Sequence, residues 1–569
     1  MSRSPLFSLF KTAHRALRHS RDSGVPLNAA ALSASFTSRR RFLQATGAVS
    51  LAAALPVLGA GSCETIEPPS DTRKRVAIVG AGMAGLHCAL RLEEAAADRL
   101  IITLFEAQER VGGRMFSDRS TFAPLHCELG GELIDSGHTT MRDLAAEFGL
   151  TLLDFADDDQ TLESIVAQFS GARVSVADIL TAYAPIAARI DADLATITGD
   201  GYVTYDAPNN GEALDVQTIK GWFDALVTDG TITADNIARR LFEVAFNIEY
   251  GRETDEQSVL NMMVLTSTDT GELAVFGESD ERYHIAEGND ALITKMHEAL
   301  SSETRFKYRL TALSRNADGV FVLTFDNDGA TVTTEADEVV IALPFTIVRD
   351  IDIADSVTLS PQKRLAIDNI GYGTNAKLML GFTSQFWRNK KGVNTSNGET
   401  FSDTGYQATW ETSRLQGGDA GIITNFTGGD RGVSVGEGTP ESQATRFLLE
   451  FETVFPGVSA TYNDKLARFH WPTNPFVKAS YACYLPGQYS TICGAEIESE
   501  ADGHLHFCGE HTSLDAQGYM EGAALTGAAA AVAVVDNLGS AASAALLVDT
   551  PVWQRARKVR ARIPLRRRR

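Results

Sequence analysis

The first regular pattern of hydrophobic and polar positions starts near Arg73. Residues 75–79 form a short β-branched run that ends at Gly80, and an Ala/Leu-rich stretch over 83–92 follows. The apolar run at 100–105 is again typical of a buried strand. Strand, glycine turn, helix and second strand, in this order, predict the start of an α/β domain with a parallel sheet.

Later patterns lead the chain back to this first domain. Residues 287–290 precede an amphipathic helix that reaches Leu300, and the β-prone runs 320–325 and 331–334 predict a hairpin. The apolar run 339–344 then returns the chain to the first domain. The first domain is therefore expected to be assembled from separate parts of the sequence.

The length of the chain also predicts two domains, because the roughly 500 residues that follow the N-terminal region are too many for one hydrophobic core. We assign 73–133, 282–344 and 487–540 to the first domain. Residues 134–281 and 345–486 form the second domain, which we expect to be helical in its first part and strand-rich in its second. The two domains are interleaved along the sequence.

The N-terminal region has the pattern of an export signal. Residues 38–44, Ser-Arg-Arg-Arg-Phe-Leu-Gln, precede an apolar run at 48–60, which is shorter than the ~20 residues that span a bilayer. This order is typical of a twin-arginine signal. We expect residues 1–62 to be a signal region recognised by the Tat translocase, and the protein to be periplasmic or extracellular.

The boundary of this signal leaves two alternatives open. Cleavage could fall near Ala60, or Cys63 could be acylated and anchor the protein to lipid. Residues 63–72, which include Pro68 and Pro69, are expected to be a disordered linker to the folded part.

Composition excludes several classes of function. The chain has 51 basic and 73 acidic residues, a net charge of −22 at pH 7, which argues against nucleic acid as a partner. An acidic surface would favour a cationic small molecule or a basic protein partner, and it would equally serve solubility. Six cysteines without a CxxC pair predict neither a disulfide framework nor a zinc site, so we expect no metal.

The C-terminal end carries the opposite charge. Residues 555–569 contain nine Lys or Arg and no acid, and Ile563, Pro564 and Leu565 interrupt them. We expect 541–569 to be a disordered basic tail with no membrane-spanning segment. Three alternatives stay open: the tail contacts anionic lipid, contacts the acidic body of the protein itself, or is simply solvated.

The glycine turn after the first strand indicates a dinucleotide site. Gly80 permits the turn, Gly82 lets a pyrophosphate approach the backbone, and Gly85 lets helix and strand pack closely. Met83 and Ala84 begin the helix, whose N-terminus faces the phosphate charge.

An acid at the end of the second strand completes this fingerprint. Glu106 lies twenty-one residues after Gly85, where a carboxylate accepts hydrogen bonds from ribose hydroxyls and repels a 2′-phosphate. Two further glycine turns, at 110–114 and 128–131, allow the backbone to run against a flat cofactor. NAD enzymes do not usually need these turns.

A block near the C-terminus predicts a strand, a loop and a second helix N-terminus. It comprises 506–512 and 518–523, where Gly-Tyr-Met-Glu-Gly begins an Ala-rich helix that reaches Val535. Such a terminus offers free N–H groups and a partial positive charge to an anionic group.

Together these segments resemble the flavin-containing amine oxidase family, which includes monoamine oxidases, polyamine oxidases and L-amino-acid oxidases. The resemblance rests on 79–86, 105–114, 128–131 and the C-terminal block. It implies a bound FAD and the α/β fold of that family, in which a Rossmann-like FAD domain is interleaved with a mixed α+β substrate domain.

The resemblance also assigns residues to the cofactor. It implies that Arg114 contacts the pyrophosphate region, Glu510 the ribityl or pyrophosphate side, and the backbone N–H of Met520 the flavin ring. A strand around Leu310 would hold the adenine end. The cofactor residues expected in full are Gly80, Gly82, Met83, Ala84, Gly85, Glu106, Ala107, Arg114, Gly130, Gly131, Glu132, Leu133, Leu310, Glu510, Gly518, Tyr519 and Met520.

Three residues are expected to act on the substrate. By the resemblance, Lys377, which precedes a Phe-Trp pair, holds a water against flavin N5; the alternative is a surface lysine. Tyr481 and Tyr519 match the two aromatic rings that flank the substrate nitrogen. For the first ring Tyr484 is a competing candidate, and a core role is the alternative for Tyr481. The acidic triplet 157–159 would lie near an entrance or in a solvated loop.

One position departs from the monoamine oxidases: Ser480 stands where those enzymes place the cysteine that bonds to FAD. We therefore expect non-covalent FAD.

The expected reaction is oxidative deamination of an amine. A hydride equivalent leaves the carbon beside the nitrogen, the imine is hydrolysed, and dioxygen or a periplasmic acceptor takes the electrons, dioxygen giving hydrogen peroxide. Alternatives are an L-amino-acid oxidase, although no single arginine stands out as its carboxylate ligand, and a flavoprotein that binds a ligand without turning it over. A carbon–carbon desaturase or porphyrinogen-type oxidase would not need the tyrosine pair or Lys377.

Overall fold

The computed structural model describes residues 71–159, 162–199, 201–388, 395–539 and 550–562. The twin-arginine segment, Cys63, nearly all of the linker and the last seven residues lie outside the described residues. What the sequence predicts for them stays a prediction, as do the exact domain boundaries.

A five-stranded parallel sheet forms the core of the first domain, as the sequence predicts. Its order is β20-β13-β1-β2-β9, and every neighbouring pair is parallel. Segments from three distant parts of the chain therefore meet in one sheet. The strands are β1 Lys74–Val79, β2 Leu100–Glu106, β9 Glu303–Phe306, β13 Glu338–Ile341 and β20 Leu505–Phe507.

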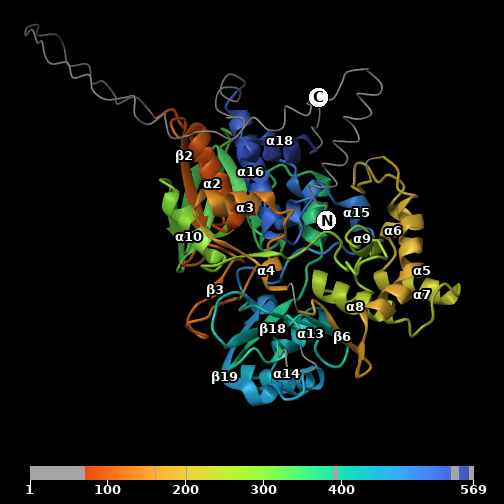
Figure 1. The fold of residues 1–569 in the computed structure, drawn as a ribbon. Coiled ribbons are helices and arrows are strands. Elements are labelled where there is room, and N and C mark those ends of the chain that lie inside the picture. The colour runs from red at the N-terminus through yellow and green to blue at the C-terminus, as the bar shows by residue number, and fades with distance from the viewer. Residues whose placement is uncertain (1–70, 160–161, 200, 389–394, 540–549, 563–569) are drawn as a thin grey trace, which may run out of the picture. The chain divides into compact units, whose positions relative to one another are not determined.

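Two helices cross this domain in close contact, α2 Met83–Ala96 and α16 Met520–Asn537, and Figure 1 shows them side by side. Their glycines make this approach possible. A Cβ on Gly527 of α16 would lie 2.3 Å from the carbonyl oxygen of Ala84 in α2, and one on Gly85 would lie 1.9 Å from that of Gly80. Helix α2 is thereby held against both the sheet and α16.

The predicted hairpin and the amphipathic helix are confirmed. Strands β11 Phe321–Asn327 and β12 Ala330–Ala336 pair antiparallel. They belong to a four-stranded sheet of order β12-β11-β10-β14, with β10 Arg309–Arg315 and β14 Asp352–Ile353. The helix is α10 Asp290–Ala299.

The second domain contains a seven-stranded sheet of order β19-β15-β18-β17-β16-β6-β7. Most of its strands come from the predicted strand-rich part: β15 Ala376–Phe382, β16 Thr400–Ser402, β17 Ala408–Glu411, β18 Gly421–Thr427 and β19 Tyr462–His470. The helical part contributes the edge of the sheet with β6 Val166–Phe169 and β7 Ala172–Val174. The chain is therefore less strictly divided into helical and strand regions than its sequence predicts.

Helices dominate residues 134–281 as expected. Those of the described region are α3 Thr139–Glu147, α4 Ala156–Asp159, α5 Val176–Leu194, α6 Glu212–Asp215, α7 Ile219–Thr228, α8 Ile237–Tyr250 and α9 Val259–Met263. The later helices are α11 Phe345–Val348, α12 Pro361–Asn369, α13 Gly429–Val435, α14 Pro440–Val454 and α15 Gln488–Thr491. Four short strands complete the description: β3 Ser117–Asp118, β4 Cys127–Glu128, β5 Leu152–Asp154 and β8 Tyr283–Ile285.

The basic C-terminal segment is not disordered throughout, which corrects the prediction made for it. Residues Pro551–Ala561 form helix α18, which packs on α16 and buries Trp553. Arg555 donates to Asp143 at 2.7 Å and Arg562 to Asp515 at 2.6 Å. The described part of the tail therefore contacts the acidic body of the protein, because burial of one apolar face and complementary charge both favour the docked helix.

Within the described part of the chain, no helix combines the length and the apolar character that a membrane crossing requires.

Candidate active site

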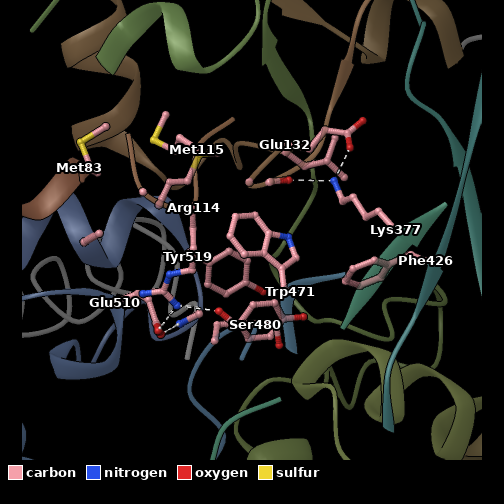
Figure 2. A pocket seen from close by; sticks show the side chains of 18 of the residues that line it. Met83, Arg114, Met115, Glu132, Lys377, Phe426, Trp471, Ser480, Glu510 and Tyr519 are labelled. Atoms are coloured by element: carbon pink, nitrogen blue, oxygen red, sulfur yellow. Dashed lines mark hydrogen bonds and ion pairs between the residues drawn. The ribbon is translucent and has the colours of Figure 1, made fainter. Parts of the chain in front are cut away.

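One cavity of about 740 Å³ collects the predicted site residues. It extends from the glycine turn after β1 to side chains of the second domain, and Figure 2 shows part of its lining. Every predicted cofactor and catalytic residue lines it except Gly85. Gly85 lies behind the turn, where its role is close packing of α2, as predicted.

The nucleotide end of the cavity is built by glycines. Gly80 has a φ of 103°, and a Cβ there would lie 2.6 Å from the carbonyl oxygen of Ala342. A Cβ on Gly82 would meet no protein atom closer than 3.9 Å, so Gly82 leaves open space beside the backbone. No side chain caps the N-terminus of α2. Its free N–H groups and partial positive charge therefore fit a pyrophosphate in that space.

The carboxylate of Glu106 is held at the end of β2. Its two oxygens accept hydrogen bonds from the backbone N–H groups of Ala81 and Gln108, both at 2.9 Å. Leu310 also lines the cavity, at the start of β10. This arrangement fits the expected ribose and adenine end of a dinucleotide.

An ion pair between Arg114 and Glu510 joins three segments of the cavity wall (Figure 2). The Arg114 guanidinium donates to Glu510 Oε1 at 2.7 Å and to the carbonyl oxygen of Ser480 at 2.8 Å. Glu510 Oε2 accepts the backbone N–H of Gly518 at 2.9 Å. Both residues are thus engaged with the protein as well as facing the cavity.

The flat-cofactor end is formed by the second glycine turn and α16. A Cβ on Gly131 would lie 2.9 Å from the Met520 side chain, and one on Gly130 would lie 1.8 Å from the carbonyl oxygen of Arg114. No side chain caps the N-terminus of α16, where Tyr519 is the N-cap residue. This end therefore leaves backbone N–H groups that fit a planar ring, and the contact with the ring itself stays a prediction.

Lys377 is buried at the start of β15 and is not a surface lysine. Its ammonium donates to the carbonyl oxygens of Glu128 and Gly130 at 3.1 and 2.9 Å and to Glu132 Oε2 at 2.7 Å. Each ammonium hydrogen thus has a protein acceptor, so a water beside Lys377 has to share one of them. The bond to the carbonyl oxygen of Glu128 is the longest of the three, so a water that takes its place costs the least hydrogen-bond energy.

Glu132 serves as the counter-ion of Lys377 (Figure 2). Its other oxygen accepts from the indole N–H of Trp410 at 2.9 Å and from the Thr412 hydroxyl. Burial pushes the pKa of Glu132 upward, but the charges of Lys377 and His284 and its hydrogen bonds outweigh burial and hold that pKa below its ordinary value. Glu132 therefore lines the cavity, as expected of a cofactor residue. Its ion pair with Lys377 is a contact that the sequence does not predict.

The two predicted tyrosines are neighbours in space although 38 positions separate them. A Cβ on Gly518 would lie 3.4 Å from the Tyr481 ring, so the residue before Tyr519 touches Tyr481. Both hydroxyls donate to the C-terminal end of α8, Tyr481 to the carbonyl oxygen of Ile248 at 3.1 Å and Tyr519 to Glu249 Oε1 at 2.9 Å.

The competing candidate, Tyr484, does not line the cavity. Its hydroxyl donates to Glu496 at 3.0 Å, and its ring lies 4.5 Å from that of Tyr489 in the core. The described geometry therefore favours Tyr481 for the first ring.

The family model described as flavin containing amine oxidoreductase matches residues 83–535. The chain belongs to this family. Polyamine oxidase 6 of Oryza sativa subsp. japonica is 25% identical over 84% of this chain and 92% of its own length. An L-amino-acid oxidase of Vipera ammodytes ammodytes is 22% identical over 80% of this chain and 92% of its own length.

A solved putrescine oxidase, bound to putrescine, has the same fold as this flavin-containing amine oxidoreductase. It matches with a TM-score of 0.66 and 19% identity, over 82% of this chain and 99% of its own. The predicted fold class and the predicted class of enzyme, an oxidoreductase acting on amines with a flavin, are thereby confirmed.

Sequence reasoning missed several residues that line the cavity of this amine oxidoreductase. Glu249, Glu281 and Glu399 bring carboxylates to it, and Trp410 and Phe426 bring rings whose centroids lie 5.2 Å apart. Isolated acids at element ends carry no motif, so no local signal identifies them.

The acidic triplet 157–159 is not a free patch. The Asp158 carboxylate accepts two hydrogen bonds from Arg388, at 2.9 and 2.6 Å. Its charge is therefore already paired, and the triplet lies in helix α4 and not in the solvated loop given as its alternative.

Replacing Glu132 by Gln leaves the Lys377 ammonium buried without a counter-charge. We expect the free energy of unfolding to fall by about 3 kcal/mol, as when one partner of a buried ion pair is removed. Denaturant unfolding of the flavin-loaded protein measures this loss. The double variant Lys377→Met with Glu132→Gln should lose less than the sum of the single variants, and strictly additive losses would contradict the pairing.

Proposed function

We propose that the protein catalyses the FAD-dependent oxidative deamination of an amine. The observation that carries the proposal is the meeting of Tyr481, Tyr519 and Lys377 in the cavity that also holds the glycine turns. Bound FAD supplies the chemistry by accepting a hydride equivalent from the carbon beside the amine nitrogen. The imine is then hydrolysed, and the electrons pass to dioxygen, giving hydrogen peroxide, or to a periplasmic acceptor.

The chain itself orients the amine and manages charge. The rings of Tyr481 and Tyr519 form two sides of a slot, and their hydroxyls are fixed by α8. Such rings attract an amine through their faces and exclude water, which restricts the substrate to few orientations. Lys377 holds a positive charge, or a water that accepts a proton, beside the ring end of the cavity.

We further propose that the FAD is not covalently bound. Ser480 lines the cavity, and its hydroxyl donates a hydrogen bond to Asn375 Oδ1 at 2.6 Å. The described cavity lining includes no cysteine. Acid precipitation of the purified protein should leave the flavin in solution, and flavin that stays with the pellet would contradict this part of the proposal.

We also propose export by the Tat translocase to the periplasm or beyond, with the lipid anchor at Cys63 as an open alternative. The support is the order of residues 38–44 and the physical requirement that a tightly enclosed cofactor be loaded onto a folded chain. Fractionation of cells expressing the chain with Arg39 and Arg40 replaced by Lys tests the route: unchanged export would exclude it.

The decisive experiment for the reaction is anaerobic mixing of the yellow protein with amines. The amines are primary amines, diamines, N-methylated amines and L-amino acids. We expect at least one of these classes to bleach the flavin absorbance as fast as the enzyme turns over with the same amine in air. Bleaching follows because the amine reduces the flavin and no acceptor reoxidises it. A protein that binds amines without bleaching would be a flavoprotein that does not turn its ligand over.

Replacing Tyr519 by Ala should lower kcat/KM for the amine by roughly tenfold or more, because the substrate loses one side of the slot. Tyr519→Phe, which retains the ring, is the matched control and should lose much less. Stopped-flow reduction of the flavin measures both, and the visible spectrum checks that FAD stays bound. If Ala and Phe variants react alike, the ring does not position the substrate.

A further inference from the structure

The side of the cavity beside the tyrosine pair carries a group of carboxylates that the proposed reaction does not use. Glu249, Glu281 and Glu399 line it, and we call these three residues the acidic wall. They come from the end of α8, from the segment before β8 and from the strand edge at β16. Side chains from three separate elements thus converge on one space.

Glu281 is held in place by a neighbouring carboxylate. Its backbone N–H donates to Asp135 Oδ1 at 2.9 Å, and the Ser279 hydroxyl donates to the same oxygen at 3.0 Å. Its φ of 44° lies in the left-handed region, which costs free energy for a residue with a side chain and persists where the surroundings fix it. The position of Glu281 at the cavity is therefore imposed by the structure around it.

The cationic side chains that line the cavity are directed elsewhere. Arg282, next to Glu281, donates to both oxygens of Asp154 at 2.7 and 2.6 Å. Lys377 is paired with Glu132, and Arg114 with Glu510. Arg414 donates to the carbonyl oxygen of Phe155 at 3.2 Å and lies 3.6 Å from Asp158. Arg309, the remaining one among the described lining residues, begins β10 at the nucleotide end.

Burial is the main influence on the pKa of two carboxylates of the acidic wall, Glu281 and Glu249, and neighbouring negative charge adds to it. Burial raises the pKa of Glu281 well above its ordinary value, and repulsion from Glu399, Asp135 and Glu249 adds to the effect. Burial likewise raises the pKa of Glu249 to about 7, although its hydrogen bond from Tyr519 opposes this. Carboxylates enclosed in this way are stabilised in their charged form by a cation in the same cavity.

The acidic wall begins at the proposed slot for the amine. Glu249 accepts the Tyr519 hydroxyl at 2.9 Å, so it contacts the ring that flanks the reacting nitrogen in our proposal. A molecule held between the rings and extending along the cavity reaches the carboxylates with its other end. A second positive charge there is favoured, and a carboxylate there is repelled.

We propose that the substrate is a diamine or polyamine and that Glu281, with Glu249 and Glu399, binds its distal ammonium. This proposal rests on the proposed function and narrows it to substrates with two positive charges. An α-amino acid is disfavoured because its carboxylate would face the acidic wall, and the described cationic residues of the lining already have other partners or lie at the nucleotide end.

The test compares substrates of equal length that differ in their distal group. Anaerobic flavin reduction is measured with 1,4-diaminobutane, with n-pentylamine, which replaces the distal ammonium by a methyl group, and with L-ornithine, which adds a carboxylate. We expect the diamine to have the highest kcat/KM. In Glu281→Gln the kcat/KM for the diamine should fall by roughly 30-fold or more, as when one partner of a charge pair is removed. The kcat/KM for n-pentylamine should change less than about twofold, because n-pentylamine lacks the distal charge.

Two matched variants serve as controls. Glu298→Gln removes one negative charge from an exposed position on α10, away from the cavity, and should leave all three substrates unchanged. Glu281→Asp keeps the charge and should retain part of the preference for the diamine. The visible flavin spectrum and the thermal midpoint of each variant show whether it is folded with cofactor.

The outcomes separate this proposal from the proposed function. If no amine bleaches the flavin, the proposed function fails. If n-pentylamine or L-ornithine reduces the flavin as efficiently as the diamine, or if Glu281→Gln slows diamine and monoamine equally, the acidic wall does not select a second charge and only this inference is overturned. If Glu281→Gln does not fold, the test rests on the wild-type protein: a kcat/KM for the diamine no higher than that for n-pentylamine overturns the inference, and a clearly higher one supports it.

Discussion

The ion pair between Arg114 and Glu510 is the interaction on which the arrangement of the active site depends. Arg114 fixes the carbonyl oxygen of Ser480, and Glu510 fixes the backbone N–H groups of Ala482 and Gly518. These backbone groups flank Tyr481 and directly precede Tyr519. One ion pair, in which Glu510 is buried and Arg114 is partly exposed, thus holds both rings of the proposed slot and links them to the glycine turn that follows the first βαβ unit.

A second ion pair gives the cavity its electrical asymmetry. Lys377 and Glu132 neutralise each other beside Gly130, so the ring end carries a positive group whose charge is largely balanced. Three further carboxylates gather in the acidic wall, which contacts Tyr519 through Glu249, while the lining cations described above are directed to other partners or to the nucleotide end. The cavity is therefore closer to neutral where the cofactor is expected and negative where the far end of a substrate would lie.

The parts of this architecture that sequence predicts are those that local physics dictates. Gly80, Gly82 and Gly85 are required by backbone geometry within a few residues, so their spacing alone indicates the turn, the adjacent strands and the helix. The resemblance to a family predicts that Lys377, Tyr481 and Tyr519 share one site, and all three line the same cavity.

What the sequence does not reveal depends on contacts between distant elements. Glu132 and Lys377 are 245 positions apart, and nothing in either neighbourhood specifies the other. Glu249 and Glu281 are single acids at the ends of ordinary elements, and only the fold turns them toward the same space. Helix α18 escapes prediction because its high charge is typical of disorder, whereas its stability comes from Trp553 and from acids on other segments.

Tyr519 connects the flat-cofactor end of the cavity with the acidic wall. Its backbone is the N-cap of α16, whose free N–H groups face the flat-cofactor end, and its hydroxyl donates to Glu249 of the acidic wall. A positive charge bound at the wall favours the ionised Glu249, and an ionised acceptor forms a stronger hydrogen bond than a neutral one. If the proposed diamine binds there, its distal charge would therefore strengthen the contact that orients the Tyr519 ring, and recognition of the far end of the substrate would be coupled to alignment of its near end through one side chain.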